Sequence, residues 1–213
     1  MDTGDSRNSF FCAFRCHLAI KARLDIFGVV FVGGITAVGG GILRDIMIGE
    51  YPPAVFTNYL IFGVAAVTAL LTFAVMYFCR SRFEEFRARI EHINMFFDAI
   101  GLAVFSVIGT EVSFTHGFGE NMLFSVVLGM LTGVGGGIMR DILTDTTPYI
   151  FKKHVYALAS IAGSCVYYLL RIRVGNLILS SSISIVLVIV MRMLAAKYRW
   201  SLPKIHLDDE ESK

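Results

Sequence analysis

Long apolar runs without a charged side chain constrain the fold of this chain more than any other feature. A helix that crosses the hydrocarbon core of a bilayer needs about 20 apolar residues, because each residue adds about 1.5 Å. Five runs contain no Asp, Glu, Lys or Arg, and a sixth contains only Asp98, which a membrane helix turns toward protein or water. The sequence therefore predicts an all-α polytopic membrane protein, with spans within residues 26–43, 51–79, 93–110, 121–139, 154–170 and 174–191.

The charged and metal-binding residue types support this class and argue against others. Only 17% of the 213 residues are charged, against about 25% in soluble domains. The basic residues lie in short segments between the apolar runs, where membrane topology accounts for them, so no nucleic-acid partner is expected. The cysteines and histidines form no Cys-x-x-Cys or Cys/His cluster. We therefore expect no metal and no cofactor.

The beginning of the chain does not follow the pattern of long apolar runs. Residues 1–10 are polar, and the short apolar segment after them is interrupted by Arg15 and His17. No small-residue cleavage site follows, so this segment is not a typical signal peptide. We predict that residues 1–10 are disordered or frayed. Residues 10–21 are expected to form at most a half-length helix, which leaves the first span incomplete.

An internal repeat relates two of the apolar runs. The segment ITAVGGGILRDIMIGEYP at 35–52 aligns with LTGVGGGIMRDILTDTTP at 131–148, at an offset of 96 residues. The identities include a glycine triplet, the Arg-Asp pair after it and a proline, which indicates a duplication. The predicted division is 1–92 for a first three-helix repeat, 93–173 for a second, and 174–213 for a seventh helix and a tail.

Three crossings per repeat imply that the two units are inverted across the membrane. The charges between the spans test this orientation independently, because basic residues are concentrated in cytoplasmic segments. The strongest basic segment is 80–92, which contains Arg80, Arg82, Arg87 and Arg89. Following the chain from this segment places the N-terminus outside and the C-terminal tail in the cytoplasm. The protein is expected to be a multi-pass protein of the cell inner (plasma) membrane.

The repeated motif is the predicted functional centre. Three consecutive glycines cost about 1 kcal/mol each relative to alanine in a helix, so we expect both helices to be broken there, where they face protein or an aqueous cavity. Charged residues follow each triplet and are costly at this depth unless they are paired or hydrated. The candidate pathway residues are Gly39, Gly40, Gly41, Arg44, Asp45, Asp98, Gly135, Gly136, Gly137, Arg140 and Asp141.

Neighbouring residues on a helix do not face each other. Arg44 is therefore expected to pair across the repeat with Asp141, and Asp45 with Arg140, unless a shared aqueous cavity hydrates them. Either arrangement brings the two motifs together near the midplane, as in many transport proteins.

Close packing is the alternative interpretation of the glycines. Gly129, Gly133 and Gly137 follow one another at the four-residue spacing of packed membrane helices. This spacing leaves Gly39, Gly40, Gly135 and Gly136 unexplained, which favours permeation over a purely structural ion-pair motif.

Three other features have two interpretations each. Asp98 is either a pathway acid or a helix-packing hydrogen-bond partner, and Asp25 is interpreted first as an N-terminal helix cap. The segment 80–92 is interpreted first as a solvated connector. Its alternative role is to bind the anionic headgroups of membrane lipid.

The motifs TAVGGGILRD and TGVGGGIMRD, each with a proline downstream and with LDIFG ahead of the first, resemble the prokaryotic branch of the trimeric intracellular cation channel family, also grouped as the glycine-transporter-domain family. The resemblance covers roughly residues 17–205, and family-like sequence resumes near Leu18. It implies a seven-helix protomer with inverted three-helix repeats, and self-association into a homotrimer. It also implies a pore in each protomer, between the helices that hold the two glycine triplets, which passes monovalent cations such as potassium.

A carrier for glycine or another small zwitterionic amino acid is the alternative function. Arg44 or Arg140 would hold the carboxylate of such a substrate, while Asp45 or Asp141 would meet its amine. An enzyme is not expected, because no Ser-His or Cys-His arrangement suggests a nucleophile. The permeant species is therefore predicted to be a small ion or an amino acid.

Overall fold

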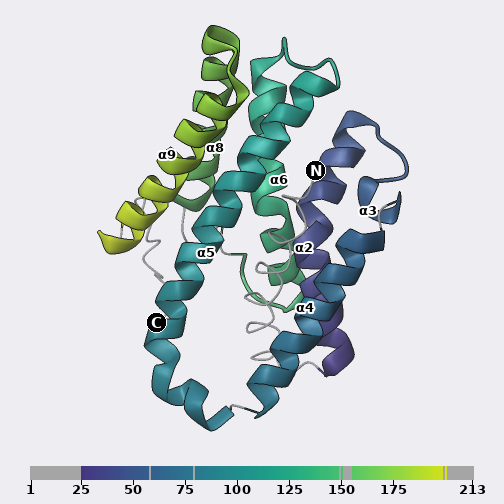
Figure 1. Cartoon of the computed structure of the whole chain (residues 1–213), viewed down its shortest axis with the longest axis vertical. Coiled ribbons are helices and arrows are strands. Elements are labelled where there is room, and N and C mark those ends of the chain that lie inside the picture. Colours follow the sequence, from purple (N-terminus) through teal and green to yellow (C-terminus); the bar gives the residue numbers. More distant parts are fainter. Residues whose placement is uncertain are drawn as a thin grey trace, which may run out of the picture.

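The computed structural model describes residues 25–57, 59–78, 80–148, 150, 155–198 and 200. The elements in these residues are helices, and no strand occurs among them. They are α2 (Ile26–Ile48), α3 (Ala54–Thr57), α4 (Tyr59–Phe78), α5 (Arg80–Thr115), α6 (Met122–Leu143), α8 (Val155–Val174) and α9 (Leu177–Lys197). The long helices lie side by side along one common direction (Figure 1).

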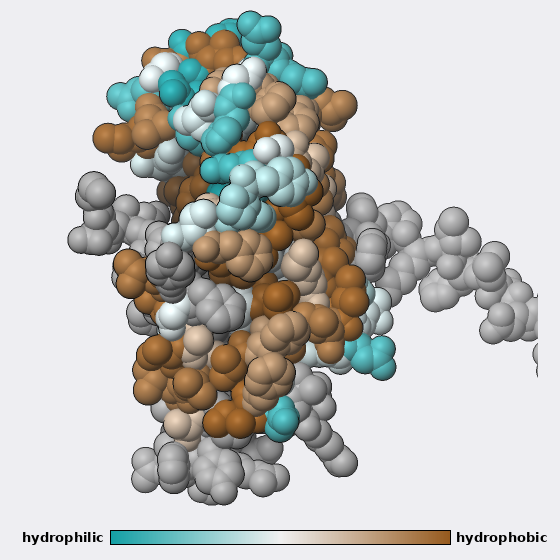
Figure 2. Space-filling model, turned by 90° about the vertical axis from the view of Figure 1, so that its right-hand side faces the viewer, coloured by the Kyte–Doolittle hydropathy of each residue, from teal (hydrophilic) through white to brown (hydrophobic). Residues whose placement is uncertain are grey.

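The predicted all-α membrane fold is confirmed. Five segments are long and apolar enough to cross a membrane: α2, α6, α9, and the parts Met95–Thr115 of α5 and Tyr156–Val174 of α8. The sixth predicted span corresponds to α4, whose 20 residues include no charged side chain. The side face in Figure 2 is covered mostly by hydrophobic side chains, while hydrophilic ones gather toward its top. The chain is a multi-pass membrane protein.

Polar residues define where the spans begin. Asp25 accepts a hydrogen bond from the backbone N–H of Gly28 at 2.7 Å, which confirms it as the N-cap of α2. Asn121 and Asn176 cap α6 and α9 in the same way, at 3.0 and 3.1 Å. These caps satisfy backbone donors that the first turn of a helix leaves unpaired.

Two tight connections reverse the chain between spans. Gly117 lies between α5 and α6 with φ of 81°, and Gly175 lies between α8 and α9 with φ of 70°. Glycine adopts this left-handed backbone without the steric cost of a Cβ. These two connections lie at the same end of the bundle, which we call the upper end (Figure 1). The lower end holds the end of α4 and the start of α5, and the ends of α6 and α9 point toward it (Figure 1).

Two predicted boundaries differ from the observed ones. The span predicted within 51–79 contains the short α3 and then α4, which begins at Tyr59. Pro52 and Pro53 lie before α3, because proline lacks the backbone N–H that a helix interior needs. The segment 80–92 is not a loop but the first part of the 36-residue α5. The predicted division between residues 92 and 93 therefore falls inside one continuous helix, and the repeat division stays a prediction.

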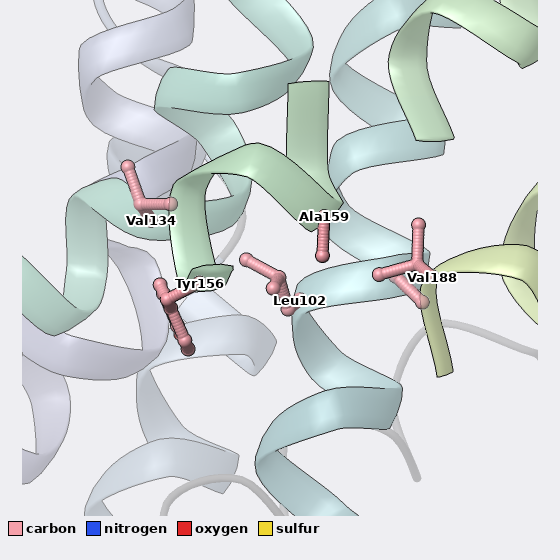
Figure 3. Close-up of a cluster of buried hydrophobic side chains, with 6 residues drawn as sticks. Leu102, Val134, Tyr156, Ala159 and Val188 are labelled. Atoms are coloured by element: carbon pink, nitrogen blue, oxygen red, sulfur yellow. The ribbon is translucent and has the colours of Figure 1, made fainter. Parts of the chain in front are cut away.

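The centre of the second half of the molecule is α6, which packs against α2, α5 and α8, while α9 packs against α5 and α8. One hydrophobic core, built from Val29, Val32, Ala65 and Ala69, joins α2 to α4. The other includes Leu102, Val134, Tyr156, Ala159 and Val188, and it joins α5, α6, α8 and α9 (Figure 3). The predicted incomplete first span, residues 1–10 and 10–21, lies outside the described residues, as does the tail after residue 200.

Candidate functional site

The two glycine triplets lie against each other where α2 and α6 cross. A Cβ built on Gly39 would lie 3.5 Å from the Cα of Gly136, and one built on Gly135 would lie 3.2 Å from the Cα of Gly40. A Cβ on Gly40 would overlap the backbone carbonyl oxygen of Thr132. The two backbones are therefore in direct contact, and the structure brings together the two motifs that the repeat related.

The predicted interruption of both helices is wrong. α2 is helical from Ile26 to Ile48 and α6 from Met122 to Leu143, so each helix passes through its triplet without a break. Among the described residues, the glycines with positive φ are Gly49, Gly117 and Gly175. The physical reason for Gly39, Gly40, Gly135 and Gly136 is therefore the missing side chain, which allows close contact of the two backbones.

The glycines of α6 at four-residue spacing contact other helices than α2. A Cβ on Gly133 would lie 2.5 Å from the Oγ of Ser106 on α5, and one on Gly129 would lie 2.5 Å from the Oγ of Ser164 on α8. The packing interpretation therefore applies to both sets of glycines. One set faces α5 and α8, and the other faces α2.

The predicted ion pairs between the repeats are also wrong. Each arginine binds the aspartate that follows it: Arg44 Nη2 lies 2.6 Å from Asp45 Oδ1, and Arg140 Nη2 lies 2.8 Å from Asp141 Oδ1. Although adjacent Cβ atoms diverge on a helix, the long arginine stem turns its guanidinium back to the neighbouring carboxylate. Both carboxylates are buried, with 2% and 4% of their side chains exposed.

The antiparallel crossing explains why the two pairs cannot exchange partners. Position 39 lies against 136 and 139, while position 43 lies against 135, so residue numbers rise in opposite directions along α2 and α6. Arg44 follows the crossing on α2, toward the upper end, and Arg140 follows it on α6, toward the lower end. About eight residues of helix, or about 12 Å along the axis, separate the two pairs.

The two motifs end in the same local structure. In each, the third glycine leaves space beside its own arginine: Gly41 has Arg44 Nη2 at 4.0 Å, and Gly137 has Arg140 Nη2 at 3.9 Å from its built Cβ. After each Arg-Asp pair the backbone N–H five residues further on donates to the aspartate carbonyl, from Glu50 at 2.9 Å and Thr146 at 2.8 Å. This matching geometry agrees with a duplicated unit.

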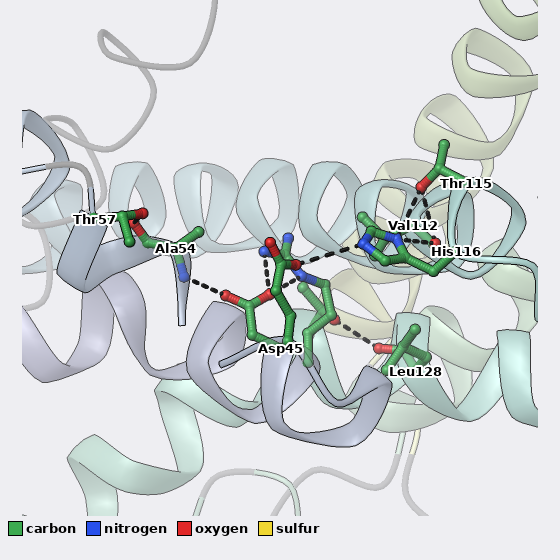
Figure 4. Close-up of polar contacts among 10 residues, drawn as sticks. Asp45, Ala54, Thr57, Val112, Thr115, His116 and Leu128 are labelled. Atoms are coloured by element: carbon green, nitrogen blue, oxygen red, sulfur yellow. Dashed lines mark hydrogen bonds and ion pairs between the residues drawn. The ribbon is translucent and has the colours of Figure 1, made fainter. Parts of the chain in front are cut away.

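Asp45 has a second partner that ties α2 to α3. Its Oδ2 accepts a hydrogen bond from the backbone N–H of Ala54 at 2.9 Å, while its Oδ1 binds Arg44 (Figure 4). Close by, His116 Nε2 lies 3.5 Å from Glu50 Oε2 and joins the ends of α2 and α5 at the upper end. Asp45 therefore has a structural role in addition to its place in the motif.

Asp98 is not beside the α2–α6 crossing but in a second polar cluster. Its Oδ2 lies 3.6 Å from Arg192 Nη2, and its Oδ1 accepts a hydrogen bond from Tyr156 at 3.4 Å. Arg192 belongs to α9, and its guanidinium lies 4.6 Å from the centre of the Tyr156 ring. We name Asp98, Tyr156 and Arg192 the lower cluster.

Sequence reasoning missed Arg192 and a further ion pair. Arg192 directly follows the apolar run 174–191 and lies five residues before the end of α9. An arginine so close to an apolar run was the signal in the sequence that could have identified it. At the upper end, Glu111 of α5 accepts hydrogen bonds from Tyr167 at 2.7 Å and from Arg171 Nε at 3.1 Å. Glu111 lies just beyond the predicted span 93–110 and is not among the predicted site residues.

Comparisons with known proteins agree with the doubled motif. The chain matches the glycine transporter family over residues 9–78 and 95–171. This match begins upstream of Leu18, where the resemblance was expected to resume. The inner membrane protein YadS of Escherichia coli (strain K12) is 35% identical over 196 residues, which cover 90% of this chain and 89% of YadS.

Two solved structures share the fold. One, described as the structural basis for conductance through TRIC cation channels, has a TM-score of 0.82 and 28% identity, and covers 97% of this chain and 98% of the other. The second is a prokaryotic TRIC channel in 0.5 M KCl, with a TM-score of 0.76, 26% identity, and coverage of 93% and 95%. The resemblance to the prokaryotic branch of the trimeric intracellular cation channels is confirmed, and the chain belongs to the glycine transporter family of membrane proteins.

Proposed function

We propose that this protein is a monovalent cation channel, that potassium is its permeant ion, and that the pathway of each protomer runs along the crossing of α2 and α6. The observation that carries the proposal is the pair of Arg-Asp motifs on the two sides of this crossing, in helices that span the bilayer. Charged side chains at such depth are costly and mark ion pathways. The solved relative described as a TRIC cation channel adds the class of ion.

The pairing within each motif favours a channel over a carrier for glycine. A zwitterionic amino acid needs a cation for its carboxylate and a separate acid for its amine. In this structure Arg44 and Arg140 are each bound to their own aspartate, so neither charge of a pair is available without breaking that pair. We place the constriction of the proposed pathway at the crossing, where Gly40 and Gly135 are in close contact.

We further propose a homotrimer with one pathway per protomer, in the orientation that the basic segment 80–92 indicates. In that orientation the lower end faces the cytoplasm and the upper end faces outward. The family resemblance and the TRIC channel relatives support self-association. We propose no enzymatic activity.

Ion flux into proteoliposomes tests the channel directly. The purified protein is expected to give unitary potassium currents in planar bilayers and potassium flux in vesicles, without saturable uptake of radiolabelled glycine. Empty vesicles and vesicles that contain an unrelated membrane protein are the controls. Saturable glycine uptake without currents would instead establish the carrier.

Cysteine labelling tests the orientation. In a background without the four native cysteines, an impermeant maleimide added outside intact cells is expected to label Arg173→Cys and to leave Arg87→Cys unlabelled until the membrane is permeabilised. The reason is that Arg173 lies at the upper end of α8, whereas Arg87 belongs to the basic first part of α5. Labelling of Arg87→Cys in intact cells, with Arg173→Cys protected, would reverse the topology.

A further inference from the structure

The lower cluster combines groups from three helices at one level of the bundle. Asp98 comes from α5, Tyr156 from α8 and Arg192 from α9. The Arg192 side chain is only 4% exposed and the Asp98 side chain 15%. The guanidinium contacts the carboxylate at 3.6 Å and the face of the tyrosine ring at 4.6 Å. A ring face attracts a cation independently of any carboxylate.

The packing register connects this cluster to the glycine motif of α6. A Cβ on Gly129 would lie 2.7 Å from the carbonyl oxygen of Ser106, and one on Gly133 would lie 3.2 Å from that of Leu102. One further turn of these antiparallel helices places Asp98 level with Gly137. The hydroxyl of Tyr156 lies 4.0 Å from the built Cβ of Gly137, whose other neighbour is Arg140. The lower cluster therefore borders the second motif.

A hydrophobic layer lies one turn further into the bundle. Leu102 follows Asp98 by four residues on α5, and Val188 precedes Arg192 by four on α9, so each lies on the same helix face as its charged neighbour. Both are completely buried and belong to one core with Ala159 (Figure 3). This layer separates the charges of the lower cluster from the middle of the bundle.

Stability alone gives little reason for this buried ion pair. Apolar side chains that replace such a pair are often neutral or stabilising, because burial of two charges costs more than their attraction returns. In a membrane helix an ionisable residue is more commonly part of an ion pathway or a charge relay. Arg192 follows an uncharged stretch of α9 and reaches a carboxylate on α5.

We propose that the Asp98 carboxylate is a binding position for the permeant monovalent cation at the lower end of the pathway, and that Arg192 is a tethered cation that occupies it in this conformation. When the guanidinium leaves the carboxylate and keeps its contact with the Tyr156 ring, the Asp98 carboxylate becomes available to a free cation. Arg192 and the permeant ion thus compete for one acid. This inference rests on the proposed cation channel and names one of its ion positions and the residue that controls access to it.

Potassium flux through proteoliposomes, measured over a range of potassium concentrations, tests the competition. For Arg192→Gln the concentration that gives half-maximal flux is expected to fall about tenfold, because a competing unit charge a few ångström away is removed. Arg192→Lys retains a tethered cation and is expected to stay near the wild-type value. The double variant Asp98→Asn with Arg192→Gln is expected to lose the gain, since the carboxylate is absent.

Arg171→Gln is the matched control. It breaks another arginine–carboxylate contact with α5, from α8 to Glu111, at the upper end, where both side chains are more exposed than in the lower cluster. Its half-maximal concentration is expected to match the wild type. If Arg192→Gln and Arg171→Gln both lower thermal stability and leave the half-maximal concentration unchanged, the lower cluster only holds α9 in place, and the proposal is overturned.

Two further outcomes keep the proposal and the channel function separate. If Arg192→Gln does not insert, Asp98→Asn decides: the proposal expects lower flux per inserted protomer at every potassium concentration, whereas a structural role changes only the melting temperature. Absence of cation flux in the wild type would refute the channel function itself. Wild-type flux with an unaltered Asp98→Asn variant would refute only the inference.

Discussion

Replacement of Gly40 by alanine is expected to lower the free energy of unfolding by about 1–3 kcal/mol, the usual cost of overpacking a close contact. The added Cβ would overlap the backbone carbonyl oxygen of Thr132, and no side-chain rotation relieves a clash with backbone. The two helices must therefore separate. Thermal unfolding of the purified protein in detergent measures the loss. Potassium flux per inserted protomer is expected to fall as well, because the proposed pathway runs along this crossing.

Alanine at Gly63 of α4 is the control for this effect. A Cβ there would meet no atom within 4 Å, so the substitution is expected to be neutral or to stabilise the helix by up to about 1 kcal/mol. Gly135→Ala tests the same contact from α6, where the new Cβ would lie 2.8 Å from the Leu43 side chain and 3.2 Å from the backbone of Gly40. Equal melting temperatures for the Gly40 and Gly63 variants would show that α2 and α6 are not in backbone contact.

Neutralisation of Asp141 is expected to reduce potassium conductance about thirtyfold. Asp141→Asn leaves the Arg140 guanidinium without its countercharge beside the proposed pathway. At an effective dielectric constant near 20 and a distance near 8 Å, one uncompensated positive charge raises the energy of a passing cation by about 2 kcal/mol. Single-channel recordings of the inserted protein measure this change, and reversal potentials report the accompanying loss of preference for cations over anions.

Two variants separate this electrostatic effect from misfolding. The double variant Arg140→Gln with Asp141→Asn removes both charges and is expected to recover most of the conductance. Asp25→Asn is the matched control, because asparagine is also a good N-cap and Asp25 lies outside the proposed pathway at the start of α2. If Asp141→Asn only reduces the amount of inserted protein, and the conductance of each channel is unchanged, the Arg-Asp motif is a structural ion pair.

Asp45 is a less suitable position for the same experiment. Its carboxylate also accepts the backbone N–H of Ala54, so a substitution there disturbs the entry into α3 as well as the charge of the motif. An asparagine oxygen can still accept this hydrogen bond, whereas alanine cannot. The difference between Asp45→Asn and Asp45→Ala therefore reports the structural part of its role.

The sequence by itself determined the membrane fold and the position of the duplicated motif. Hydrophobic runs of bilayer length leave a chain few choices, because every backbone group in lipid must be paired inside a helix. All six predicted spans are helices, and Asp25 is the cap that its position indicated. The doubled glycine motif indicated which two helices meet, because the two copies of a duplicated segment are expected to make equivalent contacts.

Only the tertiary structure decided what the glycines and charges do at that meeting. A flexible backbone and a close approach of two helices both require glycine, so the sequence did not distinguish a broken helix from a tight crossing. The direct contact of Gly40 with the backbone of Thr132 identifies a tight crossing. The inverted arrangement placed Arg44 and Arg140 on opposite sides of the crossing, so each arginine binds its own neighbour. Asp98 and Arg192 are 94 residues apart in the chain, and only the packing of α9 against α5 brings these two charges together.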